Sequence, residues 1–379
     1  MRICIVSPYF TPFVRSSEYY LAQTLTEFGH DVTILTSTSK APREAMVTGK
    51  RYEKKHNFEV KYLKCVDFDE NPIAPSVFFH VLRGGYNVVM LREDYPIMCH
   101  LAFFASKARK IPTILTTERT YYPTGLKGIL LRALDATVNK ILREGVSAYT
   151  AHCSAAVEFS KKKLGTSRAM VITPAGVDSN LFRPLPKDDF YLEEGNIRLF
   201  TVARLHKYKG LQYLIKAFEK VVQERKDAKL YILGKGPEER ALKRLAMDLG
   251  VDDKIVFISK PIPNTEMPRV YTECDIYVQP SVIEPFGIAV LEAMACGKPV
   301  VGTRIGGMLD IIVDGKTGFL VPPADASALS KAILKLVEDR TLLKKMGENA
   351  REEALQYDWN IIAKRYLDLI NKISNQTKR

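Results

Sequence analysis

The chain has 379 residues, a length that exceeds one ordinary hydrophobic core and fits two domains of about 150 to 200 residues each. Its composition, 46% hydrophobic and 26% charged, is typical of a globular protein, and no apolar run approaches the roughly 18 residues of a membrane span. The six cysteines form no C-x-x-C pair, which argues against a structural zinc site or a disulfide framework. The net charge of +13 indicates either an anionic partner or simply a solvated basic face.

The first half of the chain alternates apolar runs with helical patterns. The periodicity predicts a helix over 17–29, ended by a glycine, and another over 97–109. Strands that alternate with helices in this way indicate a parallel, doubly wound sheet. Continuous apolar runs predict its strands at 2–8, 32–36, 60–63, 88–91, 113–117 and 148–151.

The second half repeats this alternation after a polar, proline-containing passage at 183–196 that suits a connection between domains. An amphipathic stretch over 329–373 follows, and its Trp359 is interpreted as a core residue. We therefore predict an α/β protein with two Rossmann-like domains, 1–185 and 195–350, that have parallel doubly wound sheets, and a ligand cleft between them at the carboxyl ends of the strands. The strands of the second domain are predicted at 197–203, 229–234, 254–259, 275–279, 299–303 and 318–321.

The most informative segment is 281–301, S-V-I-E-P-F-G-I-A-V-L-E-A-M-A-C-G-K-P-V-V, where two carboxylates bracket a turn that opens an apolar helix. Glu292, about one turn into that helix, is a candidate acceptor for the two hydroxyls of a ribose, and Glu284 in the turn is a candidate for contact with sugar hydroxyls. The spacing of the two glutamates is weak evidence, but the strand before them and the glycine stop after them favour a nucleotide-sugar site. The first free N–H groups of the helix, which are expected to bind a phosphate, belong to Phe286, Gly287 and Ile288.

Together with other motifs, this segment resembles the retaining glycosyltransferases of family 4, whose fold has two facing Rossmann-like domains. The resemblance covers nearly the whole chain. It implies that domain 1–185 binds the acceptor, that domain 195–350 binds the donor, and that the last helix, within 351–379, crosses back onto the N-terminal domain. The further motifs are G-H-D-V-T at 29–33, P-A-G-V-D at 174–178 with Phe182 and Pro184, A-R-L at 203–205 with Lys209 and Gly210, and L-G-K-G-P at 233–237.

A sugar that leaves a nucleotide diphosphate builds negative charge on the phosphate, so the site must supply preorganised positive groups. Arg204 and Lys209 follow a predicted strand, and an Arg can hold phosphate oxygens at two points. Taken alone they would be surface charges, but the resemblance implies that they bind the donor diphosphate. It also implies that the base lies near Lys260. Gly234 permits close backbone approach or simply forms a tight turn.

Two positions depart from the family's pattern. Many relatives carry a glycine pair in the first loop, where this chain has none, and the small Ser16 and Ser17 are the candidates there for approach to a phosphate. The strand at 113–117 is usually followed by His-Asp, with the His on the donor sugar, whereas this chain has Glu118 and Arg119. Three interpretations stay open: Glu118 accepts hydrogen bonds from the sugar, it orients Arg119 towards a phosphate or acceptor, or it marks weakened catalysis.

The one literal D-x-D match, 67–69, lacks the flanking strand that a metal site needs, so we predict a metal-independent enzyme without a cofactor. The resemblance favours front-face attack over double displacement, and Glu284 is assigned to orientation and electrostatics. The predicted reaction moves a hexose-type sugar from a UDP- or GDP-linked donor to a lipid, glycan or small-molecule acceptor. The alternatives are a nucleotide-sugar epimerase and a non-catalytic, sugar-nucleotide-binding assembly subunit.

One amphipathic segment, 126–142, has apolar residues surrounded by basic ones. It either packs as a core-facing helix, the interpretation that we prefer here, or docks on an anionic bilayer. His152, at a predicted strand end, is interpreted as a structural histidine. We expect a cytoplasmic protein and leave open its attachment to the inner face of the membrane. Nucleic acid is not an expected partner, because no recognition motif accompanies the positive charge.

Overall fold

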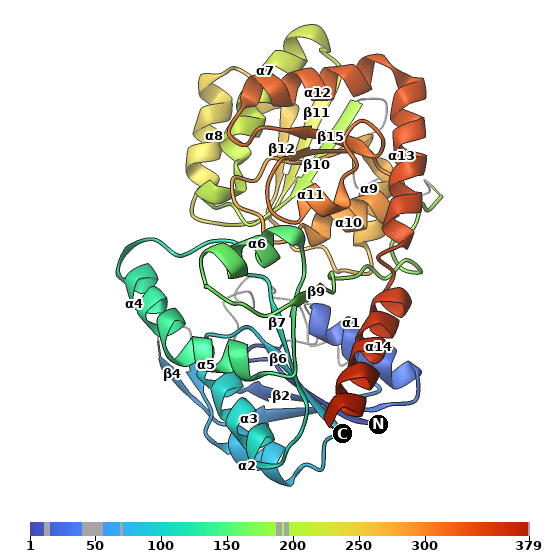
Figure 1. The fold of residues 1–379 in the computed structure, drawn as a ribbon. Helices are drawn as coiled ribbons and strands as arrows, with labels where there is room; N and C mark the ends of the chain where they lie inside the picture. Colours follow the sequence, from blue (N-terminus) through green and yellow to red (C-terminus); the bar gives the residue numbers. More distant parts are fainter. Residues whose placement is uncertain (11–15, 40–55, 69–70, 187–191, 193–196, 378–379) are drawn as a thin grey trace. The chain divides into compact units, whose positions relative to one another are not determined.

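The computed structural model describes residues 1–10, 16–39, 56–68, 71–186, 192 and 197–377, and the structural statements below concern these residues. The chain forms two compact units (Figure 1). Unit 1 comprises Met1–Gly176 together with Trp359–Arg379, and unit 2 comprises Val177–Asp358. The domain limits at 185, 195 and 350 stay a prediction, and each unit is described by itself.

Unit 1 is built on a parallel sheet whose described strands run in the order β3-β2-β1-β6-β7-β8-β9. The central strands are apolar and buried, as expected for a parallel sheet covered by helices on both faces. All carboxyl ends therefore meet at one edge. The strands are β1 (Arg2–Val6), β2 (Asp31–Ser37), β3 (Glu59–Leu63), β6 (Val88–Arg92), β7 (Thr113–Thr117), β8 (Ala148–Ala151) and β9 (Met170–Ile172).

Helices α1 (Ser17–Glu27) and α14 (Trp359–Thr377) lie side by side and share one core with strands of the unit 1 sheet (Figure 1). The rings of Tyr20 and Trp359 stack with centroids 5.9 Å apart, and Trp359 is buried, as predicted. A second core holds residues of α2 (Ser76–Arg83) and α3 (Ile97–Ala108). The remaining helices of unit 1 are α4 (Gly125–Ala136), α5 (Val138–Gly145) and α6 (Ser154–Lys162).

Unit 2 repeats the plan with a parallel sheet whose described strands run in the order β12-β11-β10-β13-β14-β15. These are β10 (Ile197–Val202), β11 (Ala228–Leu233), β12 (Ile255–Ile258), β13 (Ile276–Gln279), β14 (Val300–Thr303) and β15 (Gly318–Val321). Its helices are α7 (Leu211–Glu224), α8 (Glu239–Asp248), α9 (Met267–Glu273), α10 (Ile288–Ala295), α11 (Met308–Ile311), α12 (Ala326–Glu338) and α13 (Arg340–Leu355).

The predicted fold class, an α/β protein with two parallel sheets, is confirmed, and most predicted strand limits fall within two residues of those observed. The short strand β9 and the hairpin of β4 (Val66–Phe68) and β5 (Asn71–Ile73) were not predicted, because such short pieces leave little periodic signal. The D-x-D candidate begins in β4, and its second aspartate, at position 69, lies outside the described residues. Among the described helices, none is both long and apolar enough to cross a bilayer.

The segment 126–142 is not one core-facing helix. It divides between α4 and α5, which meet at Thr137, a residue with non-helical backbone angles of φ −122° and ψ −102°. Most apolar side chains of α4 are exposed, so the preferred interpretation of a core-facing helix is wrong for α4. The pattern misled because an apolar stripe on a helix shows amphipathicity without showing which surface it meets.

Candidate active site

The loop that follows β13 holds Glu284 in a nearly enclosed position, with 9% of the residue exposed. Its Oε2 accepts hydrogen bonds from Lys209 Nζ at 2.7 Å, from Ser281 Oγ at 3.1 Å and from Gln279 Nε2 at 3.2 Å. Each hydrogen bond that the described residues donate to this side chain ends on Oε2. The carboxylate is therefore fixed by one oxygen, and Oε1 keeps its capacity to accept from another molecule.

The backbone of this loop is fixed by close packing against two glycines. Gly306 has a φ of +52°, and a Cβ there would lie 1.6 Å from the carbonyl oxygen of Glu284. Gly210 has a φ of +70°, and a Cβ there would lie 1.9 Å from the carbonyl oxygen of Pro280. Only glycine fits either position, because a side chain would collide with backbone atoms that cannot move independently. The sequence analysis gave Gly306 no role, although a glycine pair just after a strand is a usable signal.

Arg204 and Lys209 lie beyond the carboxyl end of β10, where the sequence places them. Lys209 is the last residue of the short 3-10 helix η3 (Lys207–Lys209). Both cations lie against the ring of Tyr208, with Arg204 Cζ 5.9 Å and Lys209 Nζ 5.7 Å from its centroid. Lys209 pairs with Glu284, whereas Arg204 forms no ion pair with any described residue. The loop therefore carries one positive charge that no carboxylate in the described part of the chain offsets.

Glu292 lies in α10, the helix that begins just after the Glu284 loop. The hydroxyl of Tyr271 donates a hydrogen bond to Glu292 Oε2 at 2.9 Å. Burial raises the pKa of Glu292 to about 7, although the Tyr271 hydrogen bond favours the ionised form. Tyr271 is itself fully buried and packs edge-on against Phe200 and Tyr277. The sequence did not reveal the role of Tyr271 beside Glu292, because a tyrosine among apolar residues is typical of a hydrophobic core.

The N-terminus of α10 forms part of the same loop. Gly287, in the left-handed region with φ +103°, precedes the first helical residue, Ile288. Phe286 is buried with 3% exposed, so it anchors the turn rather than presenting a side chain to a ligand, while Ile288 is 41% exposed. The first N–H groups of any helix lack intrahelical acceptors and carry the positive end of its dipole. The turn can thus present donors to an anion close to Glu284.

Gly234 and Lys260 follow the two strands at the other side of β10. A Cβ at Gly234 would lie 1.9 Å from the carbonyl oxygen of Ala203, so this glycine lets the loops after β10 and β11 approach each other. The backbone N–H of Leu205 then donates to the carbonyl of Lys235 at 2.9 Å. Lys260 is exposed, two residues beyond β12, and makes no described hydrogen bond or ion pair with Glu284.

Glu118, the candidate of unit 1, lies at the carboxyl end of β7. Its Oε1 accepts from Arg92 Nη2 at 2.9 Å and lies 3.3 Å from His152 Nδ1. Arg92 also donates to Glu18 in α1 at 2.8 Å and contacts His152 Nε2 at 3.1 Å. Burial, and secondarily the Arg92 charge, hold the pKa of His152 well below its ordinary value, so this ring is neutral. The interpretation of His152 as a structural residue agrees with these contacts.

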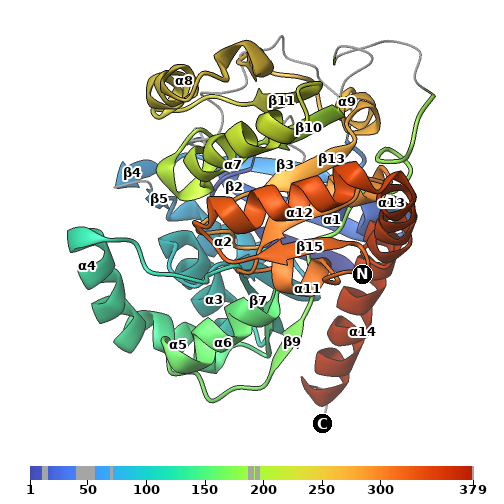
Figure 2. The ribbon, with the colours of Figure 1, turned by 90° about the horizontal axis from the view of Figure 1, so that it is seen from above.

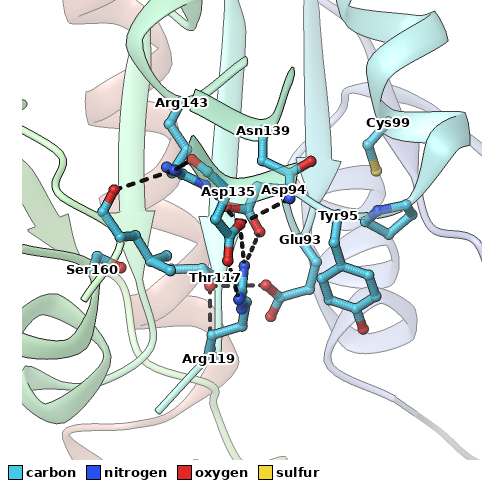
Figure 3. Close-up of polar contacts among 12 residues, drawn as sticks. Glu93, Asp94, Tyr95, Cys99, Thr117, Arg119, Asp135, Asn139, Arg143 and Ser160 are labelled. Carbon is cyan, nitrogen blue, oxygen red and sulfur yellow. Dashed lines mark hydrogen bonds and ion pairs between the residues drawn. The ribbon is translucent and has the colours of Figure 1, made fainter. Parts of the chain in front are cut away.

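Arg119, next to Glu118, belongs to a separate buried cluster (Figure 3). Its guanidinium donates to Asp94 at 2.9 Å and to Asp135 at 2.7 Å, and Arg143 donates to the same two carboxylates. Glu118 therefore does not orient Arg119, and Arg119 is committed to carboxylates rather than to a phosphate. Ser16 precedes α1 as its N-cap residue and Ser17 is its buried first residue, while most of the loop before them lies outside the described residues.

Comparison with known proteins decides the family. Residues 186–353 match the family described as "Glycosyl transferases group 1". This part of the chain belongs to the group 1 glycosyltransferases. The chain is 26% identical over 383 residues to the phosphatidyl-myo-inositol mannosyltransferase of Mycolicibacterium smegmatis, an alignment that covers 99% of this chain and 94% of that protein. It is 27% identical to the N-acetyl-alpha-D-glucosaminyl L-malate synthase of Bacillus anthracis, covering 76% and 82% of the two chains.

Solved structures show the same fold for this glycosyltransferase. Anabaena HepE in complex with UDP and glucose has a TM-score of 0.79 and 19% identity, and the match covers 98% of this chain and 100% of that one. A glycosyltransferase from Rickettsia africae has a TM-score of 0.77 at 19% identity, with coverage of 98% of both chains. The fold is GT-B, and the predicted family membership is confirmed.

Proposed function

We propose that this glycosyltransferase moves a hexose-type sugar, with retention of anomeric configuration, from a nucleotide diphosphate sugar to a lipid, glycan or small-molecule acceptor. The observation that carries the proposal is that two cations, Arg204 and Lys209, lie against one ring beyond the carboxyl end of β10, and that only Lys209 pairs with the carboxylate of Glu284. Because Arg204 has no described carboxylate partner, a diphosphate can neutralise it without breaking an existing ion pair.

The donor would lie along this edge of unit 2 with each of its parts matched to a group described above. Its diphosphate meets Arg204, Lys209 and the N-terminal N–H groups of α10. The ribose hydroxyls donate to Glu292, and a hydroxyl of the transferred sugar donates to Glu284 Oε1. As the bond between the anomeric carbon and the phosphate oxygen breaks, that oxygen keeps the electron pair, and the two cations stabilise the added charge. The acceptor hydroxyl oxygen then forms the new bond to the anomeric carbon and gives its proton to the departing phosphate oxygen.

The relatives support the class of donor but differ in the sugar. Their names specify an N-acetylglucosaminyl synthase in one case and a mannosyltransferase in the other, while a neighbouring structure holds UDP and glucose. A UDP- or GDP-linked hexose is consistent with all three. We therefore propose the donor as a class and treat the base and sugar as quantities to be measured.

The test is calorimetric titration with UDP, GDP, ADP and TDP and with their glucose, N-acetylglucosamine and mannose conjugates. Arg204→Ala should weaken binding of the preferred donor about tenfold to a hundredfold, the loss expected for a hydrogen bond between charged groups. Arg244→Ala, an exposed position in α8, is the matched control and should bind like the parent. Equal donor affinities of the parent and Arg204→Ala would show that the diphosphate does not bind at this loop. Binding without transfer to any acceptor, and without hydrolysis, would favour the assembly-subunit alternative.

A further inference from the structure

The helix α4 in unit 1 is attached to the rest of the unit by very little of its surface. All its residues are described, and of its twelve only Gly128 and Asp135 are buried. Leu126 is 81% exposed, Ile129 64% and Leu130 56%. Figures 1 and 2 both show α4 at the margin of unit 1, away from the sheet. Large apolar side chains in such a position are unusual for a surface that meets only water.

These side chains form one stripe that faces away from the unit. At about 100° per residue, Leu126, Ile129, Leu130 and Leu134 lie on one side of α4, while Gly128 and Asp135 lie on the opposite side. The backbone of Gly128 packs against the carbonyl of Pro123, where a Cβ would lie 2.0 Å from the oxygen. Asp135 accepts hydrogen bonds from Arg119 and Arg143. The inner side is thus fixed to the unit, and this attachment directs the apolar stripe outward.

Between positions 119 and 143 the exposed charged side chains are all positive. Lys127, Arg132 and Lys140 are exposed, and Asp135, the one acidic residue between positions 119 and 143, is buried and paired with arginines. Next to α4 lies a hollow of about 720 Å³ whose lining includes Tyr122, Arg132 and Lys163, together with Lys162, which pairs with the exposed Glu158. A stripe of apolar side chains with cations on its borders is complementary to the boundary between acyl chains and anionic headgroups.

We propose that α4 docks unit 1 on a bilayer that carries anionic lipids. The stripe of Leu126, Ile129, Leu130 and Leu134 enters the boundary between headgroups and acyl chains, and the flanking cations contact the headgroups. A second copy of this chain fits less well, because a two-fold contact would bring the same cations of both copies together. The proposal does not depend on the donor or on catalysis, since it concerns a surface of unit 1 alone.

The experiment is co-sedimentation of the full chain with phosphatidylcholine vesicles, with and without phosphatidylglycerol, at low and high salt. The parent should bind the anionic vesicles and release them as salt rises. Leu126→Gln combined with Ile129→Gln should weaken this binding about tenfold to a hundredfold, because two apolar anchors are lost. Lys127→Gln should weaken it about fivefold, the effect of one cation near an anionic surface.

The matched control is Phe79→Gln with Met247→Gln, two apolar residues in α2 and α8 whose side chains are more than half exposed. This control should bind vesicles like the parent, and thermal unfolding should show all variants folded, since each changed side chain is exposed. Binding of the Leu126→Gln, Ile129→Gln variant at the parent's level would overturn the proposal. So would a parent that ignores anionic vesicles but forms a dimer that the same substitutions dissolve.

Discussion

The two units each enclose a cluster of charged side chains, and the clusters are balanced differently. In unit 1, Arg119 and Arg143 are buried and share the two carboxylates of Asp94 and Asp135 (Figure 3). In unit 2, Arg204 and Lys209 lie against the same ring, that of Tyr208. Lys209 pairs with the carboxylate of Glu284, whereas Arg204 pairs with no described residue. The first cluster is neutral and complete, whereas the second keeps a positive charge at the end of a strand.

A complete cluster and an incomplete one have different physical uses. Buried charges that neutralise each other resist any change, because removing one partner leaves an uncompensated charge in a medium of low polarity. A ligand can bind a fixed cation that has no carboxylate partner without first breaking an ion pair. A diphosphate supplies the negative charge that such a cation lacks. We therefore expect substitutions in the unit 1 cluster to change stability and substitutions in the unit 2 cluster to change activity.

The largest expected effect is on stability, from Arg143→Met in unit 1. Arg143 is fully buried and donates to both Asp94 and Asp135, so its loss should lower the free energy of unfolding by about 3 to 5 kcal/mol. Urea denaturation followed by far-ultraviolet circular dichroism measures this change. Adding Asp94→Asn should recover part of the loss, because the two buried charges are then removed together.

Lys140→Met, an exposed change in the same helix α5, is the control for this measurement and should leave the midpoint of denaturation unchanged. An Arg143→Met protein as stable as the parent would show that the unit 1 cluster does not hold the fold. The two clusters could then no longer be distinguished by a role of the unit 1 cluster in stability.

The next effect, in unit 2, is on turnover. Lys209→Met removes one of two cations beside Tyr208, and turnover should fall about a hundredfold to a thousandfold, as when a preorganised donor to a developing charge is lost. Stability should fall by less than in Arg143→Met, because Glu284 keeps its hydrogen bonds from Ser281 and Gln279. Initial rates with the preferred donor measure the first change, and Lys216→Met, an exposed position in α7, is the control. Parent-like turnover would mean that Lys209 acts only as the ion-pair partner of Glu284.

The sequence was informative for the sheets and for the unit 2 site for the same reason. Parallel strands leave apolar runs, and residues just beyond them share one edge, so Arg204, Lys209 and Glu284 could be placed at that edge without coordinates. Their common role in donor binding was implied by the family resemblance. Contacts between distant segments left no such trace. The stacking of Tyr208 with two cations, the hydrogen bond from Tyr271 to Glu292 and the packing of Gly306 on the Glu284 carbonyl all depend on loop paths. For α4, the pattern gave the stripe but not its outward direction.

The smallest expected effect is a pH dependence of donor binding that arises from Glu292. Burial raises its pKa to about 7 in the free protein, and only the ionised carboxylate can accept both ribose hydroxyls. Because the donor selects the ionised form, affinity should rise about tenfold between pH 6 and pH 8, as the ionised fraction rises from about a tenth to nine tenths. Glu292→Gln should bind more weakly and lose this pH dependence.

Tyr271→Phe separates this explanation from any other titrating group. The hydroxyl of Tyr271 favours the ionised form of Glu292, so removing it should raise the pKa of Glu292 further and move the midpoint of the affinity curve to higher pH. The free energy of unfolding changes with pH in the opposite direction to donor affinity. The folded protein holds a proton on Glu292 that the unfolded chain releases near pH 4.5, so the contribution of Glu292 to stability falls as pH rises from 4.5 through about 7. If donor affinity changed with the same midpoint pH in Tyr271→Phe and in the parent, the titrating group would be a different residue. Glu292 would then not be the group that binds the ribose.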